Sequence, residues 1–83
     1  LGAAYPNPFN PITKFSLDIP EAGHVSVQVY NLKGQVVATL ENGFVDAPHK
    51  VYNWNASNVA SGMYLIKAQT ANSVTTQKLM LLK

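Results

Sequence analysis

Apolar and polar residues alternate along most of this 83-residue chain, with the two-residue period of a β-strand. Six runs keep that period at intervals of roughly 10–12 residues, which is the spacing of an antiparallel β-sandwich. They are residues 13–19 (TKFSLDI), 24–31 (HVSVQVYN), 35–41 (QVVATLE), 50–55 (KVYNWN), 62–70 (GMYLIKAQT) and 74–83 (VTTQKLMLLK). A short strand around residues 1–5 brings the expected total to about seven. No segment has a helical pattern, so we predict an all-β fold, one antiparallel sandwich spanning residues 1–83.

Glycine, proline and asparagine mark the turns between these runs. Residues 20–23 (PEAG) separate the first two strands, and residues 31–34 (NLKG) indicate a three-residue hairpin with Gly34 in the left-handed conformation. The Asn42-Gly43 pair predicts a type I′ turn that ends the third strand. Residues 44–48 lack clear alternation, so we expect them to cross between the two sheets.

The inward face of each strand supplies the expected core. The side chains predicted to be buried are Phe15, Leu17, Val27, Val29, Val37, Leu40, Trp54, Tyr64 and Ile66. Val37 and Leu40 have opposite parity, so burying both requires a bulge between them. Trp54 and Tyr52 share one face and could instead form a flat platform for sugars. We favour the core for Trp54, because so small a chain needs a large hydrophobe there.

The stretch YPNPFNPIT, residues 5–13, is unsuited to a helix or to a central strand. Each proline fixes its own φ, lacks an amide donor and pushes the residue before it toward extended geometry. The segment is therefore predicted to be a stiff, extended entry whose backbone is not fully paired in a sheet. We expect it to lie against the edge of the sandwich, with Phe9 anchored in the core.

Charge and composition argue against several classes of function. All six basic residues are lysines scattered along the chain, and four acids leave a formal net charge of +2. Nucleic-acid binders instead cluster arginine and lysine on one surface, so nucleic acid is not an expected partner. The absence of cysteine excludes disulfides and thiolate metal sites. No apolar run approaches the roughly 18 residues of a transmembrane helix, so no transmembrane segment is expected.

No set of side chains predicts catalysis, a metal site or a cofactor. His24 and His49 each start a strand and are expected to be exposed, because a lone histidine needs an oriented partner to act. The acids lie mostly at strand ends or in turns and are expected to be solvated; they are Asp18, Glu21, Glu41 and Asp46. We therefore expect a protein that is not an enzyme and that binds neither a metal nor a cofactor.

Four blocks, in a fixed order over nearly the whole chain, resemble one protein family. They are YPNPFNPITKFSLDIP, VSVQVYNLKGQVVATLENG, HKVYNWNASNVASGMYLIKAQT and TTQKLMLLK. Together they are similar to the type A C-terminal sorting domains of type IX secretion, which resemble the immunoglobulin-like domain of flagellar hook-cap proteins. The resemblance implies an immunoglobulin-like sandwich that is the C-terminal piece of a larger exported protein. Such a protein passes through the periplasm and is secreted or held at the outer-membrane surface.

The resemblance also implies partners and recognition residues. The partners are the outer-membrane translocon, a surface sortase that often removes such domains, and the upstream cargo domain. The matching positions are Pro6, Asn7, Pro8 and Phe9 in the entry motif, Gly34 in the first hairpin, Gly62 and Tyr64 in a glycine-aromatic motif, and Lys78 and Lys83 in the terminal strand. Pro48 and Ala56 stand where many members have glycine, and both departures change loop geometry.

Three functions stay open at this point. The leading one is a secretion and sorting module that acts by protein–protein recognition. The alternatives are an immunoglobulin-like structural or assembly module without a sorting role, and a carbohydrate-binding accessory module of an exported glycosidase. The final run KLMLLK, residues 78–83, has two explanations of equal weight. It either completes the sandwich inside a sheet, or it offers an edge with which a partner pairs while Lys78 and Lys83 limit aggregation.

Overall fold

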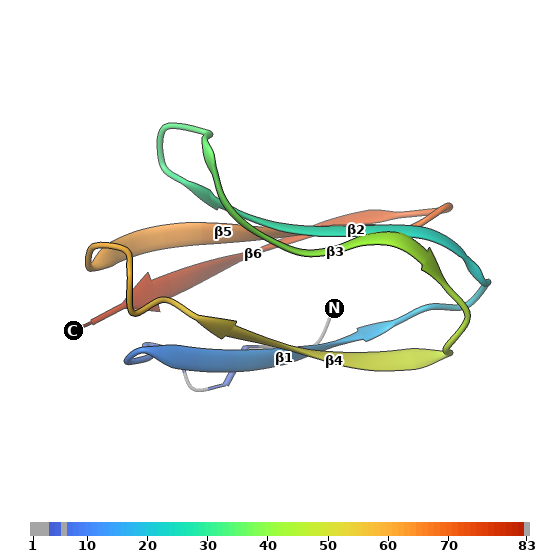
Figure 1. The fold of residues 1–83 in the computed structure, drawn as a ribbon, viewed down its shortest axis with the longest axis horizontal. Coiled ribbons are helices and arrows are strands. Elements are labelled where there is room, and N and C mark those ends of the chain that lie inside the picture. Colours follow the sequence, from blue (N-terminus) through green and yellow to red (C-terminus); the bar gives the residue numbers. More distant parts are fainter. Residues whose placement is uncertain (1–3, 6, 83) are drawn as a thin grey trace.

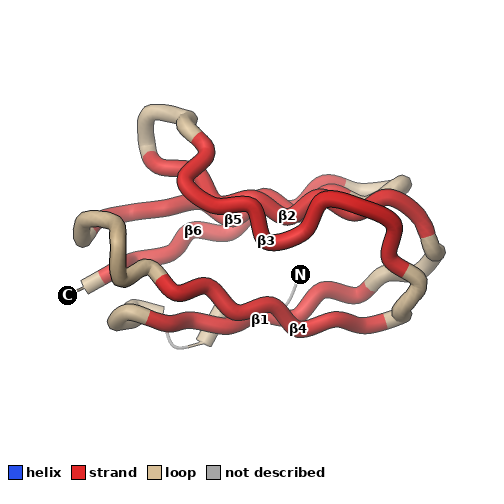
Figure 2. Tube along the Cα trace, viewed as in Figure 1, coloured by secondary structure: helices blue, strands red, loops and turns tan. Residues whose placement is uncertain are grey.

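Six β-strands and their connections make up the part of the chain that the computed structural model describes, which comprises residues 4, 5 and 7–82 (Figure 1). The strands are β1 (Ile12–Asp18), β2 (Gly23–Asn31), β3 (Val36–Val45), β4 (His49–Asn55), β5 (Gly62–Gln69) and β6 (Val74–Leu81). No helix occurs among these described residues (Figure 2), so the predicted all-β class is confirmed. The structure has six strands where about seven were predicted. Of the short strand expected near residues 1–5, only an isolated bridge from Tyr5 to Lys14 falls within the described part of the chain.

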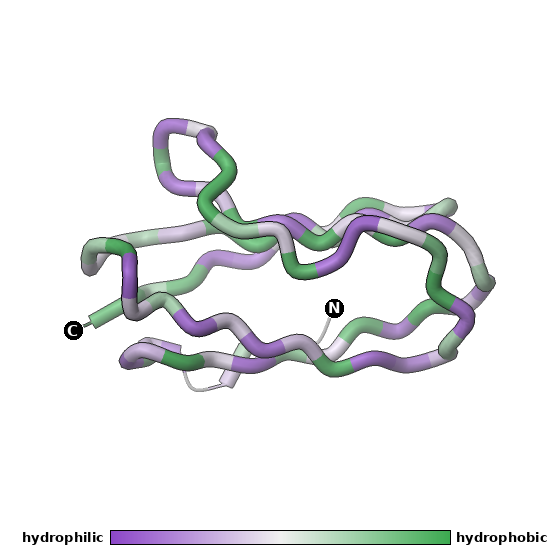
Figure 3. The backbone as a smooth tube through the Cα atoms, in the orientation of Figure 1, coloured by the Kyte–Doolittle hydropathy of each residue, from purple (hydrophilic) through white to green (hydrophobic). Residues whose placement is uncertain are grey.

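The strands form two antiparallel sheets that face each other across the core. β1 pairs with β4 in a two-stranded sheet, and the other sheet has the order β3-β2-β5-β6. The chain passes between the sheets where the absence of alternation predicted a crossing, although residues 44 and 45 still belong to β3 and only residues 46–48 cross. Hydrophobic and hydrophilic positions alternate along the strands (Figure 3), so each sheet turns one apolar face inward.

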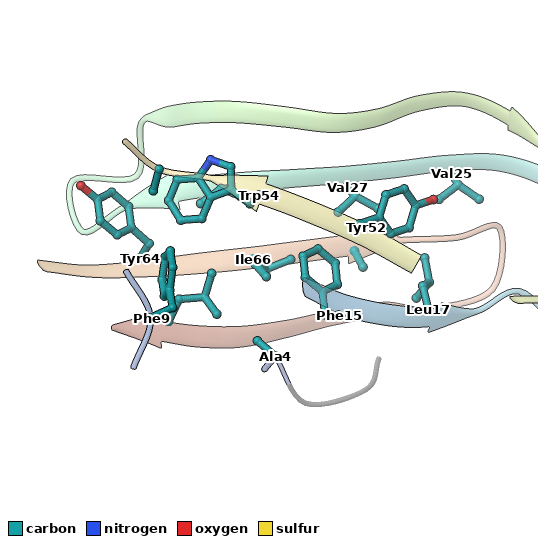
Figure 4. Packing of buried hydrophobic residues seen from close by; sticks show 14 of the residues in the cluster. Ala4, Phe9, Phe15, Leu17, Val25, Val27, Tyr52, Trp54, Tyr64 and Ile66 are labelled. Carbon is teal, nitrogen blue, oxygen red and sulfur yellow. The ribbon is translucent and has the colours of Figure 1, made fainter. Parts of the chain in front are cut away.

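Aromatic rings fill the space between the sheets (Figure 4). The Trp54 ring is packed between Phe9 and Tyr64, with centroid separations of 5.5 and 5.3 Å. Phe15 stacks on Tyr52 at 5.8 Å. Trp54 is only 4% exposed and Tyr52 6%, so the prediction that Trp54 belongs to the core is confirmed. A sugar-binding platform built from these two rings is excluded, because both lie inside the sandwich.

The predicted core is correct except at Val37 and Leu40. Both are partly buried and pack against the cluster instead of lying inside it. Neither residue has a partner in the β2–β3 register. Leu40 is skipped because Val27 pairs with Glu41 and the next residue, Gln28, pairs with Thr39. Val37 is skipped because Val29 pairs with Ala38 and Tyr30 pairs with Val36. β3 therefore carries irregularities at both positions, as their opposite parity requires. β3 is an edge strand of the wider sheet and has a neighbouring strand on one side only.

The two turn predictions around β3 have different outcomes. At residues 31–35 the three-residue hairpin forms, with Gly34 at φ +82° and the Asn31 Oδ1 accepting hydrogen bonds from the backbone N–H groups of Lys33 and Gln35 at 3.0 Å. The type I′ turn predicted at Asn42-Gly43 is wrong. Gly43 pairs with Val25 in the middle of a continuous ladder, so cross-strand pairing overrides the local turn preference.

A polar cluster joins the sheets on the side where β3 lies next to β4. The Glu41 carboxylate accepts hydrogen bonds from the Lys50 Nζ at 2.6 Å and from the Tyr52 hydroxyl at 3.0 Å. The expectation that Glu41 is a solvated strand end is therefore wrong, since it lies within β3 and its side chain is 21% exposed. The bond from Lys50 is the main reason why the pKa of Glu41 lies below its usual value, and the bond from Tyr52 adds to it. Burial, with the Glu41 charge, raises the pKa of Tyr52 above its usual range, so its hydroxyl stays protonated.

Replacing Trp54 with alanine is expected to lower the free energy of unfolding by about 3–5 kcal/mol, because the cavity between Phe9 and Tyr64 cannot collapse completely. That loss is comparable with the whole stability of a small domain. Urea denaturation measures it. The matched control is Val51→Ala on the exposed face of β4, which should cost less than about 1 kcal/mol. Equal losses in the two variants would contradict the core position of Trp54.

The Glu41 cluster predicts a specific acid sensitivity. Because the folded-state pKa of Glu41 is lowered from 4.5, its ionised form stabilises the fold above about pH 4.5, and this contribution is lost as the pH falls through the folded pKa. Glu41→Gln should be less stable than the parent at pH 7 and should lose less further stability between pH 5 and 3. The control, Glu21→Gln, removes the same charge from the exposed β1–β2 turn and leaves the hydrogen bonds of the Glu41 cluster in place. A parent-like slope in Glu41→Gln would refute this assignment.

Candidate functional site

The proline-rich stretch ahead of β1 crosses the open side of the sandwich and bonds to both sheets. We call residues 4, 5 and 7–11 the entry segment. At its start, Tyr5 and Lys14 of β1 exchange backbone hydrogen bonds of 2.8 and 3.1 Å. Further along, the Phe9 N–H donates to the Met80 carbonyl at 2.9 Å, and the Leu82 N–H donates to the Phe9 carbonyl at 3.0 Å. The entry segment therefore lies against the edge of the sandwich, as predicted, and covers the C-terminal part of the edge of β6.

Asn7 extends this pairing with its side chain in place of a peptide unit. Its Nδ2 donates to the Lys78 carbonyl at 3.1 Å, and its Oδ1 accepts a hydrogen bond from the Met80 N–H at 3.0 Å. The backbone donors of the entry segment belong to Tyr5, which bonds to Lys14 of β1, and to Phe9, which bonds to Met80 of β6, and neither residue is a proline. An alternation of prolines with pairing residues is thus compatible with an edge strand, although it would be incompatible with a central one.

Phe9 anchors the segment in the core, as expected. Its side chain is 2% exposed and its ring lies against Trp54 (Figure 4). The backbone bridge from Phe9 to Leu81 runs parallel, next to the buried side chains of β6. The side chain and the backbone of this one residue therefore connect the entry segment to the core and to the last strand.

The glycine-aromatic motif lies beside the end of β6. Gly62 has φ +150° and pairs with Leu81, and Tyr64 pairs with Leu79. The Tyr64 ring is buried against Trp54, and its hydroxyl donates a hydrogen bond to the Ala60 carbonyl. The hairpin that contains Gly34 lies at the same end of the sandwich, as do the β4–β5 loop and the end of β6 (Figure 1, left).

The structure brings together most of the residues that the sequence singled out. Asn7, Phe9 and Lys78 meet at the edge of β6, and Gly62 and Tyr64 pair with that strand from its other side. Phe9 and Tyr64 are buried, so they build the fold, whereas Asn7, Pro8, Gly34 and Lys78 are exposed. Pro6 and Lys83 lie outside the described residues. The role of these residues in recognition stays a prediction.

The two explanations of the final strand need a correction. β6 is an edge strand of its sheet, so it is not internal. Its edge is not open either, because Asn7 and Phe9 bond to Lys78, Met80 and Leu82 along it. A partner could pair with this part of β6 only after displacing the entry segment.

The two histidines lie at the starts of different strands. His24 and His49 are exposed at strand starts, as predicted, and the Nδ1 of His49 lies 3.2 Å from the Asp18 carboxylate. No three histidine or acidic side chains gather as a metal site within the described part of the chain. Among the same residues there is no helix with the length and apolarity to span a membrane.

One feature was missed in the sequence. A hollow of about 340 Å³ lies beside the hairpin on the outer face of the four-stranded sheet, and the residues that line it include Tyr30, Leu32, Leu65 and Lys67. The only signal for it was Leu32, an apolar residue at a hairpin tip where polar residues are usual.

The described residues form a small antiparallel sandwich whose proline-rich entry segment bonds to its last strand. The family model of the secretion system C-terminal sorting domain matches residues 3–82. The chain therefore belongs to that family, and the resemblance to type IX sorting domains is confirmed. A comparison with curated proteins finds no match. The family is one of sorting signals and not of enzymes, and its members accompany an upstream cargo to the cell surface or into the medium.

Asn7→Ala is expected to remove two hydrogen bonds at a partly solvated edge and to lower the free energy of unfolding by about 1 kcal/mol. The amide of Met80 loses its acceptor, so its hydrogen exchange should accelerate more than that of the Leu79 amide. Asn53→Ala is the control, because Asn53 is exposed on β4 and lies far from β6. Unchanged exchange at Met80 would show that Asn7 does not hold this edge in solution.

Proposed function

We propose that this domain is the folded signal by which the outer-membrane translocon of type IX secretion recognises an upstream cargo, and that a surface sortase then separates the two. The family match over residues 3–82 carries the proposal. The cargo arrives through the periplasm and ends at the cell surface or in the medium. The domain itself has no catalytic role and needs no cofactor.

The entry segment supports this function by its position. It joins β1 of one sheet to β6 of the other, so the first described residues of the domain are held at a defined place relative to both sheets. Such a connection gives the translocon one rigid shape to recognise, whatever the cargo is. It also keeps the edge of β6 away from other exposed strands, which protects a protein in transit from edge-to-edge aggregation.

Recognition is assigned to exposed residues and not to the buried part of the motifs. Phe9 and Tyr64 stabilise the sandwich from inside, whereas the Lys78 side chain is exposed on β6. A lysine at this place presents a positive charge next to the entry segment without taking part in an ion pair within the described residues. We therefore assign Lys78, together with Lys83, to contact with the translocon.

The test is a reporter protein fused upstream of the domain and expressed in a host that has the secretion system. Lys78→Gln combined with Lys83→Gln should reduce surface delivery several-fold at an unchanged melting temperature, because a charge contact is lost while the core is intact. Lys14→Gln, on the exposed face of β1, is the control and should be delivered like the parent. Normal delivery of the stably folded double variant would remove the lysines from the proposal.

Failure of the parent fusion to reach the surface would argue against a sorting role altogether. The interpretations left would be an immunoglobulin-like assembly module without that role and a carbohydrate-binding module that uses residues other than Trp54 and Tyr52.

A further inference from the structure

The hollow beside the β2–β3 hairpin has the features of a binding groove. We call it the hairpin groove and define it by Tyr30, Leu32, Leu65, Lys67 and Thr76. The hairpin bends away from the two-stranded sheet (Figure 1, upper left), so it stands over the outer face of the wider sheet. Tyr30 and Leu32 belong to the hairpin side of the groove, while the other three residues project from β5 and β6.

The groove has an apolar part that the sandwich does not use. Leu32 is 72% exposed, and Tyr30 and Leu65 are half-buried on the face that points away from the core. Single exposed hydrophobic residues are common on protein surfaces, but several that converge on one hollow mark a contact site. A volume of about 340 Å³ is at the lower end of the roughly 300–1,000 Å³ of ligand pockets, so the groove suits a few side chains and not a folded domain.

One lysine lines the groove, and two more lie on the elements that form it. Lys67 lines the groove. Leu65 pairs with Lys78 and Lys67 pairs with Thr76, so Lys78 lies diagonal to Lys67 on the neighbouring strand. Lys33 lies in the hairpin. None of these three lysines takes part in an ion pair among the described residues.

The acids lie elsewhere on the molecule. Three of them flank the connections at the opposite end of the sandwich, and Glu41 bonds to Lys50 between the sheets. The three are Asp18, Glu21 and Asp46. No acidic side chain lines the groove, so its charge is uncompensated.

We propose that the hairpin groove binds a short, extended, acidic segment of the secretion machinery that carries a large apolar side chain. The apolar side chain packs against Tyr30, Leu32 and Leu65, and carboxylates contact Lys67 and Lys78. This inference rests on the proposed sorting function and names the chemistry of the partner that the domain meets.

Charge also decides against other occupants. A second copy of the domain bound through the same face would place lysines opposite lysines, which is unfavourable. Anionic lipid surfaces are recognised by clusters of about four to eight basic residues, more than the three around this groove. An acidic peptide segment satisfies both the charge and the apolar hollow.

The experiment uses the same fusion reporter in the secreting host. Leu32→Ser combined with Lys67→Glu should lower surface delivery about tenfold or more, the loss expected when a central anchor of an interface is removed. The matched control is Phe44→Ser combined with Lys14→Glu, which makes the same kinds of change away from the groove. Phe44 is a 72% exposed residue of β3, and Lys14 belongs to β1 of the other sheet. Melting temperatures are measured for all variants. Should the double variant fail to fold, Leu32→Ser alone decides, because a side chain so exposed contributes little to folding.

A photo-crosslinking amino acid at position 32 identifies what occupies the groove. The expected adduct is with a protein of the secretion apparatus, it is absent when the crosslinker is placed at position 44, and it weakens in Lys67→Glu. Adducts with a second copy of the domain or with lipid would overturn the proposal, and so would normal delivery of the folded groove variants. A parent fusion that is not delivered refutes the sorting function instead, so the two failures are distinguishable.

Discussion

The contact on which the rest of this domain depends is the bonding of the entry segment to the edge of β6. A sandwich of a two-stranded and a four-stranded sheet leaves one side open between β1 and β6, where backbone groups and core side chains would meet water. The entry segment closes that side with backbone bonds at Tyr5 and Phe9 and with the Asn7 amide. Because the Phe9 ring also reaches Trp54, the edge and the core are stabilised by the same few residues.

The opposite side of the sandwich is closed by different chemistry. There Glu41 connects β3 to Lys50 and Tyr52 of β4, so a charged and partly solvated cluster replaces the backbone ladder. Such a cluster depends on ionisation, whereas the bonds of the entry segment join amide groups that do not titrate. The two sides therefore respond differently to acid, although they have the same structural task.

The family motifs divide into residues that build the domain and residues that a partner can reach. Buried aromatic residues of the motifs, such as Tyr64, are needed for folding. A substitution at such a position removes structure and recognition together, so their effects cannot be separated. Exposed residues such as Lys78 allow the two to be separated. The motif positions, the hairpin and the end of β6 gather at one end of the sandwich, while most acids lie at the other. The charges of the domain are therefore unevenly distributed between its two ends.

The sequence alone determined the strands, the crossing near residue 46, the hairpin at Gly34 and the buried position of Trp54, because alternation and turn residues act locally. It also placed the chain in its family through four motifs in order. Only the tertiary structure decided that Gly43 stays in a strand, that Glu41 joins the sheets and that Asn7 bonds to β6, since each depends on a partner distant in sequence. The hairpin groove belongs to the same group, because its walls come from β2, β5 and β6, whose order in the sheet no local pattern contains.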